Sequence, residues 1–426
     1  MQFSTPIATQ NPGQNADVGA RKRRLNTRLL GFVLVYTILA GALRKWVFSG
    51  GPVSNALLLG HVVMPWIFYL AAPGSKKQYA PVLLLFGAVL ALMAFNPLNQ
   101  SIYHGAFGIL LHLGFWLMAF HYLENRQLYP WQKLLGLLLF VFFLEVILGV
   151  VQYSLPRTHF INRYAAEGAT SIAYIGERAR VTGTFSYVAG FTSWLFFVNL
   201  WIWSLAKRGA SIRLVTILTA ITILASLISG ARAALAFTIV FAAIMYRAAL
   251  RQIPAANFLV ILFIGLIAGY GIFQKSTFVQ EAWDNFYSRI EDGIRDKEFG
   301  RRTYGVVGEI IDFRGDHPLF GTGLGATYQG ARLLWGESYF VKQYGGYEEE
   351  PERIILEGGF FLFVLRLLLL IYFLHALRFP LMYKLLFGII IAFFTHSIFN
   401  VYNIIFVPLG LSMLDWAYNN PVQNSA

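Results

Sequence analysis

Long apolar segments separated by short polar connections are the feature that most restricts the fold of this chain of 426 residues. A helix needs about 20 mostly apolar residues to cross a bilayer, and about twelve segments meet that requirement. The last two are the least distinct, because Asn400, Asn403 and Pro408 allow either a turn or a break within one segment, which would leave about eleven. The candidate segments are 29–48, 53–72, 80–96, 102–123, 134–155, 183–205, 212–229, 233–250, 257–275, 354–375, 384–401 and 404–418. We therefore expect an all-α integral membrane protein.

The composition agrees with this fold class and argues against a soluble domain. Hydrophobic residues make up 57% of the chain and charged residues 13%, whereas soluble domains carry roughly 25% charged residues. In lipid, the outer surface of a helical bundle can be as apolar as its core. The formal net charge of +13 fits basic residues at helix ends and at anionic ligands better than a nucleic-acid partner.

Basic residues also predict the orientation of the segments. Lys and Arg accumulate in the short cytoplasmic loops of membrane proteins. With the N-terminus inside, every inside connection is basic, whereas the outside loop 97–101 has no Lys or Arg. The inside residues are Lys76, Lys77, Arg126, Lys133, Lys207, Arg208, Arg213, Arg247, Arg251, Arg378 and Lys384. Both termini are therefore expected in the cytoplasm if the number of spans is even.

This topology divides the chain into five regions. They are a disordered cytoplasmic N-terminus (1–28), nine transmembrane helices (29–275), a large extracytoplasmic loop (276–352), three further helices (353–418) and a cytoplasmic tail (419–426). A second outside loop covers 156–182.

The large loop carries helical periodicity. Val279, Trp283, Phe286 and Ile290 have the spacing of an amphipathic helix, and the run from Tyr304 to Ile311 indicates a second helix. Long loops with such periodicity are more often functional than disordered. We therefore expect the working surface of the protein to face away from the cytoplasm.

Several catalytic motifs are absent or lack their context. The run GTGLGA (321–326) fits a dinucleotide pattern but has no βαβ unit around it, so we expect a flexible, tightly turning loop. Its glycines, Gly321, Gly323 and Gly325, permit close approach of a backbone to a ligand. The eight His residues show no metal-ligand spacing, cysteine is absent, and no G-x-S-x-G motif occurs. We expect no metal and no cofactor.

Two charged residues lie near the middle of predicted spans, Glu145 in 134–155 and Arg366 in 354–375. A charge at the bilayer centre costs at least about 2.5 kcal/mol and normally faces the bundle interior, where it has a partner. Two interpretations stay open, a structural bridge between Glu145 and Arg366, and a functional path through the membrane.

Arginines gather at the predicted outer ends of the spans. Arg180 precedes a span, Arg232 lies in a very short outside turn, and Arg301 and Arg302 open the second loop helix; Arg44 and Lys45 reach the same level of the first span. Arginine binds phosphate bidentately and stays charged when desolvated. Single arginines can equally extend to lipid headgroups, but Arg180 and Arg232 together favour a lipid diphosphate ligand.

Acidic residues close the large loop, at Glu348, Glu349, Glu350 and Glu352. Such runs usually form a solvated surface. A carboxylate at the outer bilayer edge could also accept a proton from a sugar hydroxyl.

Taken in order, these segments resemble the O-antigen ligase and polymerase family of bacterial membrane glycosyltransferases. The resemblance covers roughly residues 130–415. It depends on the motifs R-x-x-G-T-F (180–185), S-G-A-R (229–232), H-P-L-F-G-T-G-L-G (317–325) and L-E-G-G-F-F (356–361). The segment G-A-L-R-K-W (41–46) resembles an element of one branch of the family.

The resemblance implies a metal-independent transfer in the bacterial cytoplasmic membrane. The donor is an oligosaccharide on undecaprenyl diphosphate, and the acceptor is a sugar hydroxyl on a growing glycan or on lipid A core. Arg180 and Arg232 match the family's diphosphate-binding arginines; we add Arg302 to them, with Arg353, Glu357 and the three glycines in supporting roles. The ligases also place a His near the end of the large loop. This chain has carboxylates there, which favours a polysaccharide polymerase with Glu349 or Glu352 as base.

Two alternatives belong to other functional classes. A transporter or flippase of lipid-linked substrates would perform no chemistry, and it would have a polar site at the bilayer midplane, around Glu145 and Arg366. A non-catalytic member of an envelope polysaccharide assembly complex is the third hypothesis.

Overall fold

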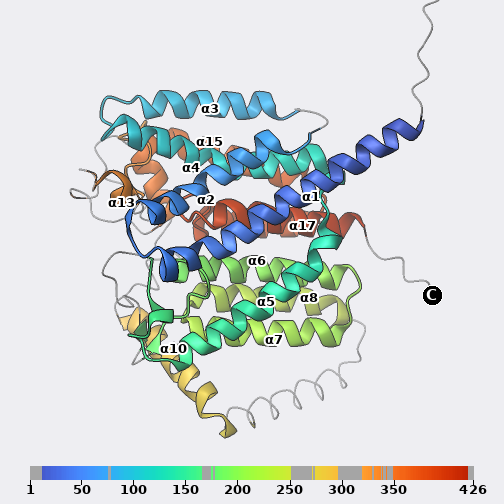
Figure 1. The fold of residues 1–426 in the computed structure, drawn as a ribbon, viewed down its shortest axis with the longest axis vertical. Helices are drawn as coiled ribbons and strands as arrows, with labels where there is room; N and C mark the ends of the chain where they lie inside the picture. Colours follow the sequence, from blue (N-terminus) through green and yellow to red (C-terminus); the bar gives the residue numbers. More distant parts are fainter. Residues whose placement is uncertain are drawn as a thin grey trace, which may run out of the picture.

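The computed structural model describes residues 12–74, 78–165, 174–175, 178–250, 271, 274–295, 319–328, 331–336, 338, 342 and 349–420. Figure 1 shows long helices packed side by side with one small hairpin. Within these residues, seven helices are long and apolar enough to cross a membrane: Gly19–Val47, Gly51–Ala71, Ile102–Leu128, Trp131–Ser154, Val188–Lys207, Ile212–Ser229 and Glu350–Ala376. The predicted all-α class of a multi-pass membrane protein is therefore confirmed. The total of twelve spans stays a prediction, since segment 257–275 falls almost entirely outside the described residues.

The first four helices pack together, the first against the second, and the second and third against the fourth. They are α1 (Pro12–Ala42), which continues into the short π-helix η1 (Leu43–Val47), α2 (Gly51–Ala71), α3 (Ala80–Ala94) and α4 (Ile102–Asn125). Because α1 already begins at Pro12, the basic cluster from Arg21 to Arg28 is helical and does not belong to a disordered terminus. Ser101 caps α4 by accepting a hydrogen bond from the backbone nitrogen of His104.

The middle of the chain adds four helices and the hairpin. The 3₁₀ turn η2 (Arg126–Leu128) leads into α5 (Trp131–Ser154), which is followed by a second 3₁₀ turn, η3 (Phe160–Asn162). The hairpin consists of the antiparallel strands β1 (Tyr174–Ile175) and β2 (Arg178–Ala179), in which Tyr174 pairs with Ala179. The helices α6 (Val188–Lys207), α7 (Ile212–Ser229) and α8 (Arg232–Leu250) follow.

The described part of the large loop is partly helical, and the last two apolar segments form separate helices. The described parts of the loop are α10 (Thr277–Arg295), residues 319–328 and α13 (Ala331–Trp335). After α15 (Glu350–Ala376), α16 (Leu381–Ile389) continues into η5 (Ile390–Phe394), and α17 spans Asn403–Asn419. Residues 395–402 are a connection between two helices, and Pro408 lies inside α17. The predicted second loop helix around Tyr304–Ile311 lies outside the described residues.

The core is organised around α17. Its side chains from Asn403 to Leu414 are buried, and it packs against α4, α6 and α2. Figure 1 shows α17 between an upper group that includes α2, α3, α4 and α15 and a lower group formed by α5, α6, α7 and α8. We call the end of the bundle that holds the α1–α2 turn, the hairpin and α10 the loop end; it lies on the left in Figure 1.

The helix α15 contains a reversal at Gly359, where φ is +67° and ψ is −176°. Glu350 and Arg366 are sixteen positions apart, which corresponds to about 24 Å in a straight helix, yet their side chains form an ion pair of 3.4 Å. The nine residues before Gly359 therefore fold back beside the residues that follow. A Cβ at this glycine would lie 2.1 Å from the carbonyl oxygen of Leu319.

Replacing Gly359 with alanine is expected to destabilise the fold by at least about 2 kcal/mol, because the backbone strain and the backbone clash act together. The measurement is the thermal stability of the detergent-purified protein, followed by size-exclusion chromatography. Gly136→Ala is the matched control, since Gly136 lies in α5 with nothing within 4 Å of its added Cβ. Equal stability of the two variants would contradict the strain argument.

The glycine run 321–326 is packed tightly against the bundle. Gly321, Gly323 and Gly325 all have positive φ, and added Cβ atoms would lie 2.4 Å from Glu357, 2.4 Å from Asn99 and 2.0 Å from His104. The backbone of Thr322 and Gly323 donates to the carbonyl oxygens of Leu356 and Glu357. These glycines bring a backbone close to α4 and α15, so the prediction of a flexible loop is wrong for this part.

Candidate functional site

A cavity of about 440 Å³ opens at the loop end, between α6, α8, α10, the start of α15 and the connection 395–402. Three of the residues that line it are arginines and one is a glutamate. Its charged and polar residues are Arg180, Thr192, Ser193, Arg232, Arg289, Glu349, Thr395, His396, Asn400 and Asn403. Its apolar and glycine residues come from α6, from the α7–α8 turn with the start of α8, and from η5, as Val188, Ala189, Phe196, Gly230, Ala231, Ala233, Ala236, Phe237 and Phe394. The cavity therefore has a cationic part and an apolar part.

Arg180 and Arg232 meet at the α7–α8 turn. The helix α7 ends at Gly230, which adopts a left-handed conformation with φ of +62°, and α8 begins two residues later. The Nε of Arg180 donates to the carbonyl oxygen of Ser229 at 3.2 Å. Arg232 is the first residue of α8, where the positive end of the helix dipole adds to its own charge. The two motifs R-x-x-G-T-F and S-G-A-R thus build one wall of the cavity.

The backbone after Arg180 is held by buried polar side chains. Oε1 of Gln152 accepts hydrogen bonds from the nitrogens of Thr182 and Gly183 at 3.0 and 2.8 Å. Lys45 Nζ donates to Thr182 Oγ1 at 2.9 Å and to the carbonyl oxygen of Gly183 at 2.5 Å. This segment presents Arg180 from a fixed backbone.

Glu145 also forms hydrogen bonds with the segment that follows Arg180. It accepts hydrogen bonds from the nitrogen of Thr184, at 3.0 Å, and from its hydroxyl. Arg44, predicted at the outer interface, is buried and donates to Ser186 Oγ at 2.9 Å and to the carbonyl oxygen of Ser54, also at 2.9 Å. In this structure Arg44, Lys45 and Glu145 all act on the segment that follows Arg180.

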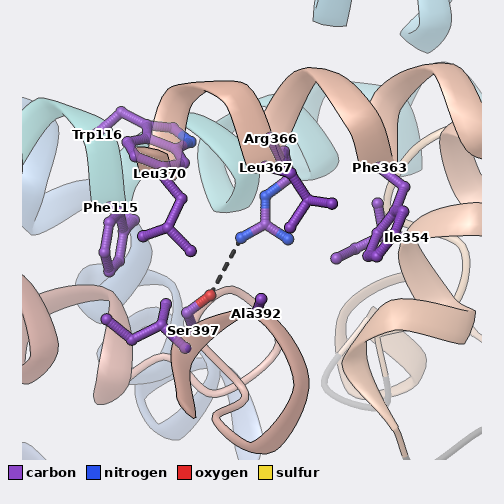
Figure 2. Close-up of a pocket in the computed structure, with 10 residues that line it drawn as sticks. Phe115, Trp116, Ile354, Phe363, Arg366, Leu367, Leu370, Ala392 and Ser397 are labelled. Atoms are coloured by element: carbon purple, nitrogen blue, oxygen red, sulfur yellow. Dashed lines mark hydrogen bonds between the residues drawn. The ribbon is translucent and has the colours of Figure 1, made fainter. Parts of the chain in front are cut away.

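The predicted pair of Glu145 with Arg366 is wrong. Arg366 pairs with Glu350 at 3.4 Å and donates to Ser397 Oγ at 3.1 Å, as Figure 2 shows for the contact with Ser397. Glu350 also accepts from Ser397 Oγ at 2.6 Å and from the nitrogen of Ile398 at 2.8 Å. Arg366 pairs with Glu350 because the reversal at Gly359 brings Glu350 back beside it. Glu145 is bonded to Thr184 instead.

The cavity beside Arg366 is small. Its volume is about 20 Å³, and aromatic and aliphatic residues such as Phe115, Trp116 and Leu370 form its walls (Figure 2). A space of this size holds about one water molecule. It offers no room for a sugar or a phosphate, so Arg366 belongs to the packing of α15 against the connection 395–402.

The helix α10 contributes a third arginine, Arg289, to the cavity and packs against the second, Arg232. Arg289 lines the cavity, and Gly293 lies so close to Arg232 that an added Cβ would be 1.8 Å from its Nη1. The hairpin fixes α10, because Arg178 donates to both carboxylate oxygens of Glu281, at 2.5 and 3.0 Å. The hydrogen bond with Glu281 raises the pKa of Arg178.

Replacing Gly293 with alanine is expected to displace Arg232 while the fold persists, because the atom in the way is the end of a flexible side chain. One charge-assisted hydrogen bond contributes about 1.5 kcal/mol or more, so the affinity of the cavity for an anionic probe such as pyrophosphate should fall about tenfold. The measurement is ligand binding by native mass spectrometry, with Gly136→Ala as the matched control. Unchanged affinity in Gly293→Ala would show that Arg232 does not depend on this contact.

The predicted acidic residues separate in the structure. Glu349 is the N-cap residue of α15 and lines the cavity. Glu352 lies one turn into α15, is buried, and is not among the cavity-lining residues. Of the two predicted bases, only Glu349 faces the same space as the arginines.

Arg353 and Glu357 belong to a buried network beside the glycine run. Glu357 accepts from His112 Nε2 at 3.0 Å, and from the nitrogen and hydroxyl of Thr327 at 3.0 and 2.5 Å. Arg353 donates to the carbonyl oxygen of Thr327 at 2.6 Å and lies over the ring of Phe399 at 3.9 Å. This network joins residues 319–328 to α4 and α15 and so supports the wall that carries Glu349.

Two titratable residues of the cavity, Arg289 and His396, were not predicted from the sequence. Arg289 follows Phe286 by three positions and Ala282 by seven, so the periodicity of α10 places it next to the buried face. His396 comes from the connection before α17, where no local pattern marks it. The predicted Arg302 lies outside the described residues. Within those residues, no group of three or more His, Cys, Asp or Glu side chains could hold a metal ion.

No family model, no curated protein and no solved structure matches this chain. The geometry of the cavity is therefore the basis on which a function can be argued.

Proposed function

We propose that the chain transfers or polymerises oligosaccharide repeats carried on undecaprenyl diphosphate, at the outer face of the bacterial cytoplasmic membrane. The observation that supports this most is the meeting of Arg180, Arg232 and Arg289 in one cavity, from three separate elements. Arginine forks match phosphate oxygens bidentately and keep their charge out of water. A diphosphate carries enough negative charge to engage all three.

The apolar part of the cavity suits the other half of such a substrate. Phe196 of α6 and Phe237 of α8 line it together with small alanines of α8. These helices belong to the membrane-crossing part of the bundle, so a prenyl chain beside them stays in an apolar environment. The cavity thus offers separate surfaces for the headgroup and the lipid tail.

The distribution of basic residues supports an outward-facing cavity. Four basic residues lie at the end of the bundle opposite the loop end: Arg208 in the α6–α7 connection, Arg213 at the start of α7, Arg378 in the α15–α16 connection and Lys384 in the first turn of α16. Basic connections belong on the cytoplasmic side. On this basis both termini are cytoplasmic and the cavity faces the outside.

The proposed reaction is a displacement at the anomeric carbon of the donor sugar. The acceptor hydroxyl oxygen forms a bond to that carbon, the bond from carbon to the diphosphate oxygen breaks, and its electron pair stays on the diphosphate. The arginines stabilise the charge that develops there, which is usually the largest catalytic contribution in such transfers. Glu349 receives the proton of the acceptor hydroxyl, with His396 beside it in the cavity.

We favour polymerisation over ligation to lipid A core. The end of the large loop has carboxylates where ligases have histidine, and one of them, Glu349, reaches the cavity. In a polymerase, one lipid-linked repeat serves as donor and another as acceptor. No separate acceptor lipid is then needed, although partners in envelope polysaccharide assembly are compatible with this role.

The transporter hypothesis has less support from the geometry. It requires a polar site at the midplane around Glu145 and Arg366. Glu145 is fully engaged with Thr184, and Arg366 with Glu350 and Ser397 beside a space of about 20 Å³. The large cavity with converging charges lies at the loop end instead.

Binding of defined lipids tests the role of the cavity. The purified protein should bind undecaprenyl diphosphate well and undecaprenol weakly, with competition between undecaprenyl diphosphate and the lipid-linked repeat. Native mass spectrometry measures each. Equal binding of undecaprenol and undecaprenyl diphosphate would contradict diphosphate recognition.

A further inference from the structure

The helix α10 presents three kinds of surface around its circumference. At about 100° per residue, the buried residues Ala282, Phe286 and Gly293 fall on one face. That face packs against α7 and the hairpin. Asp284, Ser288 and Glu291 are exposed on a polar face. A helix on the surface of a soluble protein usually has only two faces, one buried and one solvated.

The third surface is apolar and exposed. Trp283, Tyr287 and Ile294 have exposed fractions of 44%, 49% and 61%. At about 100° per residue they lie within about 40° of one another around the helix. Half-buried Val279 and Ile290 lie between this stripe and the packed face. A large aromatic stripe left exposed on a helix requires a partner.

The neighbours of α10 indicate which partner covers the stripe. Asn285 Nδ2 donates to the hydroxyl of Tyr153, near the end of α5, at 2.7 Å. On α5, the exposed Ile147 and Val151 precede Tyr153 by six and two positions. These side chains belong to the exposed apolar surface of a membrane-crossing helix. Along the bundle, α10 therefore lies at the depth where the exposed apolar surface of α5 ends.

We propose that α10 lies in the outer membrane–water interface, with Trp283, Tyr287 and Ile294 inserted into the lipid. Tryptophan and tyrosine are enriched at this level because their rings are amphipathic. The polar face then points to water, and the packed face holds Arg289 at the cavity and Gly293 over Arg232. One wall of the cationic cavity is therefore anchored in the bilayer, whichever chemistry the cavity performs.

The charges on α10 indicate that its insertion into the membrane does not depend on anionic lipid. The exposed polar side of the helix carries Asp284, Glu291, Asp292 and Arg295, so its net charge is negative and it gains nothing from negatively charged headgroups. Burial of apolar area drives the insertion. Insertion should be the same in vesicles of phosphatidylcholine alone and in vesicles that contain phosphatidylglycerol.

Nitroxide accessibility in proteoliposomes tests this proposal directly. The chain has no cysteine, so Trp283→Cys, Tyr287→Cys and Ile294→Cys each give one spin-label site on the stripe. Asp284→Cys, Ser288→Cys and Glu291→Cys are the matched water-facing controls on the same helix, and Ile147→Cys on α5 is the lipid-facing reference. Collisions with oxygen report lipid, and collisions with an aqueous nickel chelate report water.

The stripe positions should show oxygen-to-nickel ratios several-fold above those of the polar face and close to that of Ile147→Cys. Two results would overturn the proposal. Equal ratios on both faces would place the stripe in water, and protection of the stripe from both reagents would show that a protein surface covers it. Neither result depends on turnover, so each is separable from a failure of the proposed function.

Discussion

Replacing Arg232 with alanine is expected to lower glycan transfer by about 10²- to 10³-fold, the usual loss when one preorganised charge stabiliser is removed. The half-buried Arg232 is the first residue of α8, and its guanidinium lies beside Gly293 of α10 at the cavity. Its charge and the positive end of the helix dipole therefore act on the same part of the cavity. Arg180→Ala should have an effect of similar size, because Arg180 lines the same wall.

Polymer length on gels and quantified membrane insertion together measure this prediction. Arg232→Lys should recover part of the activity, since lysine keeps the charge but not the fork. The control is Arg213→Ala, a change on α7 at the end opposite the cavity, which should leave polymer unchanged. Normal polymer in both Arg180→Ala and Arg232→Ala would refute the diphosphate site.

Replacing Glu349 with glutamine is expected to lower the transfer rate by about 10²- to 10⁴-fold, the range typical of a general base. Glutamine keeps the size of the side chain but cannot take the acceptor proton. Binding of undecaprenyl diphosphate should stay the same or rise slightly, because one negative charge leaves the cavity. Single-turnover rates and binding are measured on the same purified variant.

Two control variants separate a catalytic effect of Glu349→Gln from a general loss of charge or of stability. Glu291→Gln changes an exposed carboxylate of α10 outside the cavity and should have no effect on the rate. Glu350→Gln removes the partner of buried Arg366, so it should lower stability and not a specific catalytic step. If Glu349→Gln retains full rate while His396→Gln loses it, the base is His396.

Features that depend on local pattern were predictable from the sequence. Apolar segment length predicts the helices, and the short motifs predict that Arg180 precedes a helix and that Arg232 lies in the turn before another, both on one side. The spacing of Phe286 and its neighbours predicts α10, although Trp283 proves to be exposed while Phe286 is buried. Glu349, predicted at the outer end of a span, lines the same cavity as the arginines.

Features that depend on which elements are neighbours were not predictable. The partner of Glu145 is a backbone segment about forty positions away, and the partner of Arg366 returns only because Gly359 reverses α15. His396 reaches the cavity because the connection before α17 turns inward beside Glu350. A single sequence carries no signal for such contacts, since none of them follows from periodicity or spacing.

The positioning residues give the site a rigid frame. Gln152 and Lys45 hold the backbone of Thr182 and Gly183, while Glu357 holds Thr327 beside α15. Preorganised donors stabilise developing charge without reorganising during the reaction. In this account, the buried charges of the bundle serve the cavity indirectly, by fixing the loops that carry Arg180 and Glu349.

Release of free undecaprenyl diphosphate by the purified protein would distinguish a glycosyltransferase from a transporter. The protein is incubated in detergent with a single lipid-linked repeat, no added metal ion and no lipid A core, and products are resolved by mass spectrometry. We expect one undecaprenyl diphosphate to be released for each repeat joined to another, and both products to be lost in Arg232→Ala. A substrate that binds to the protein but remains chemically unchanged would contradict the account and favour a transporter.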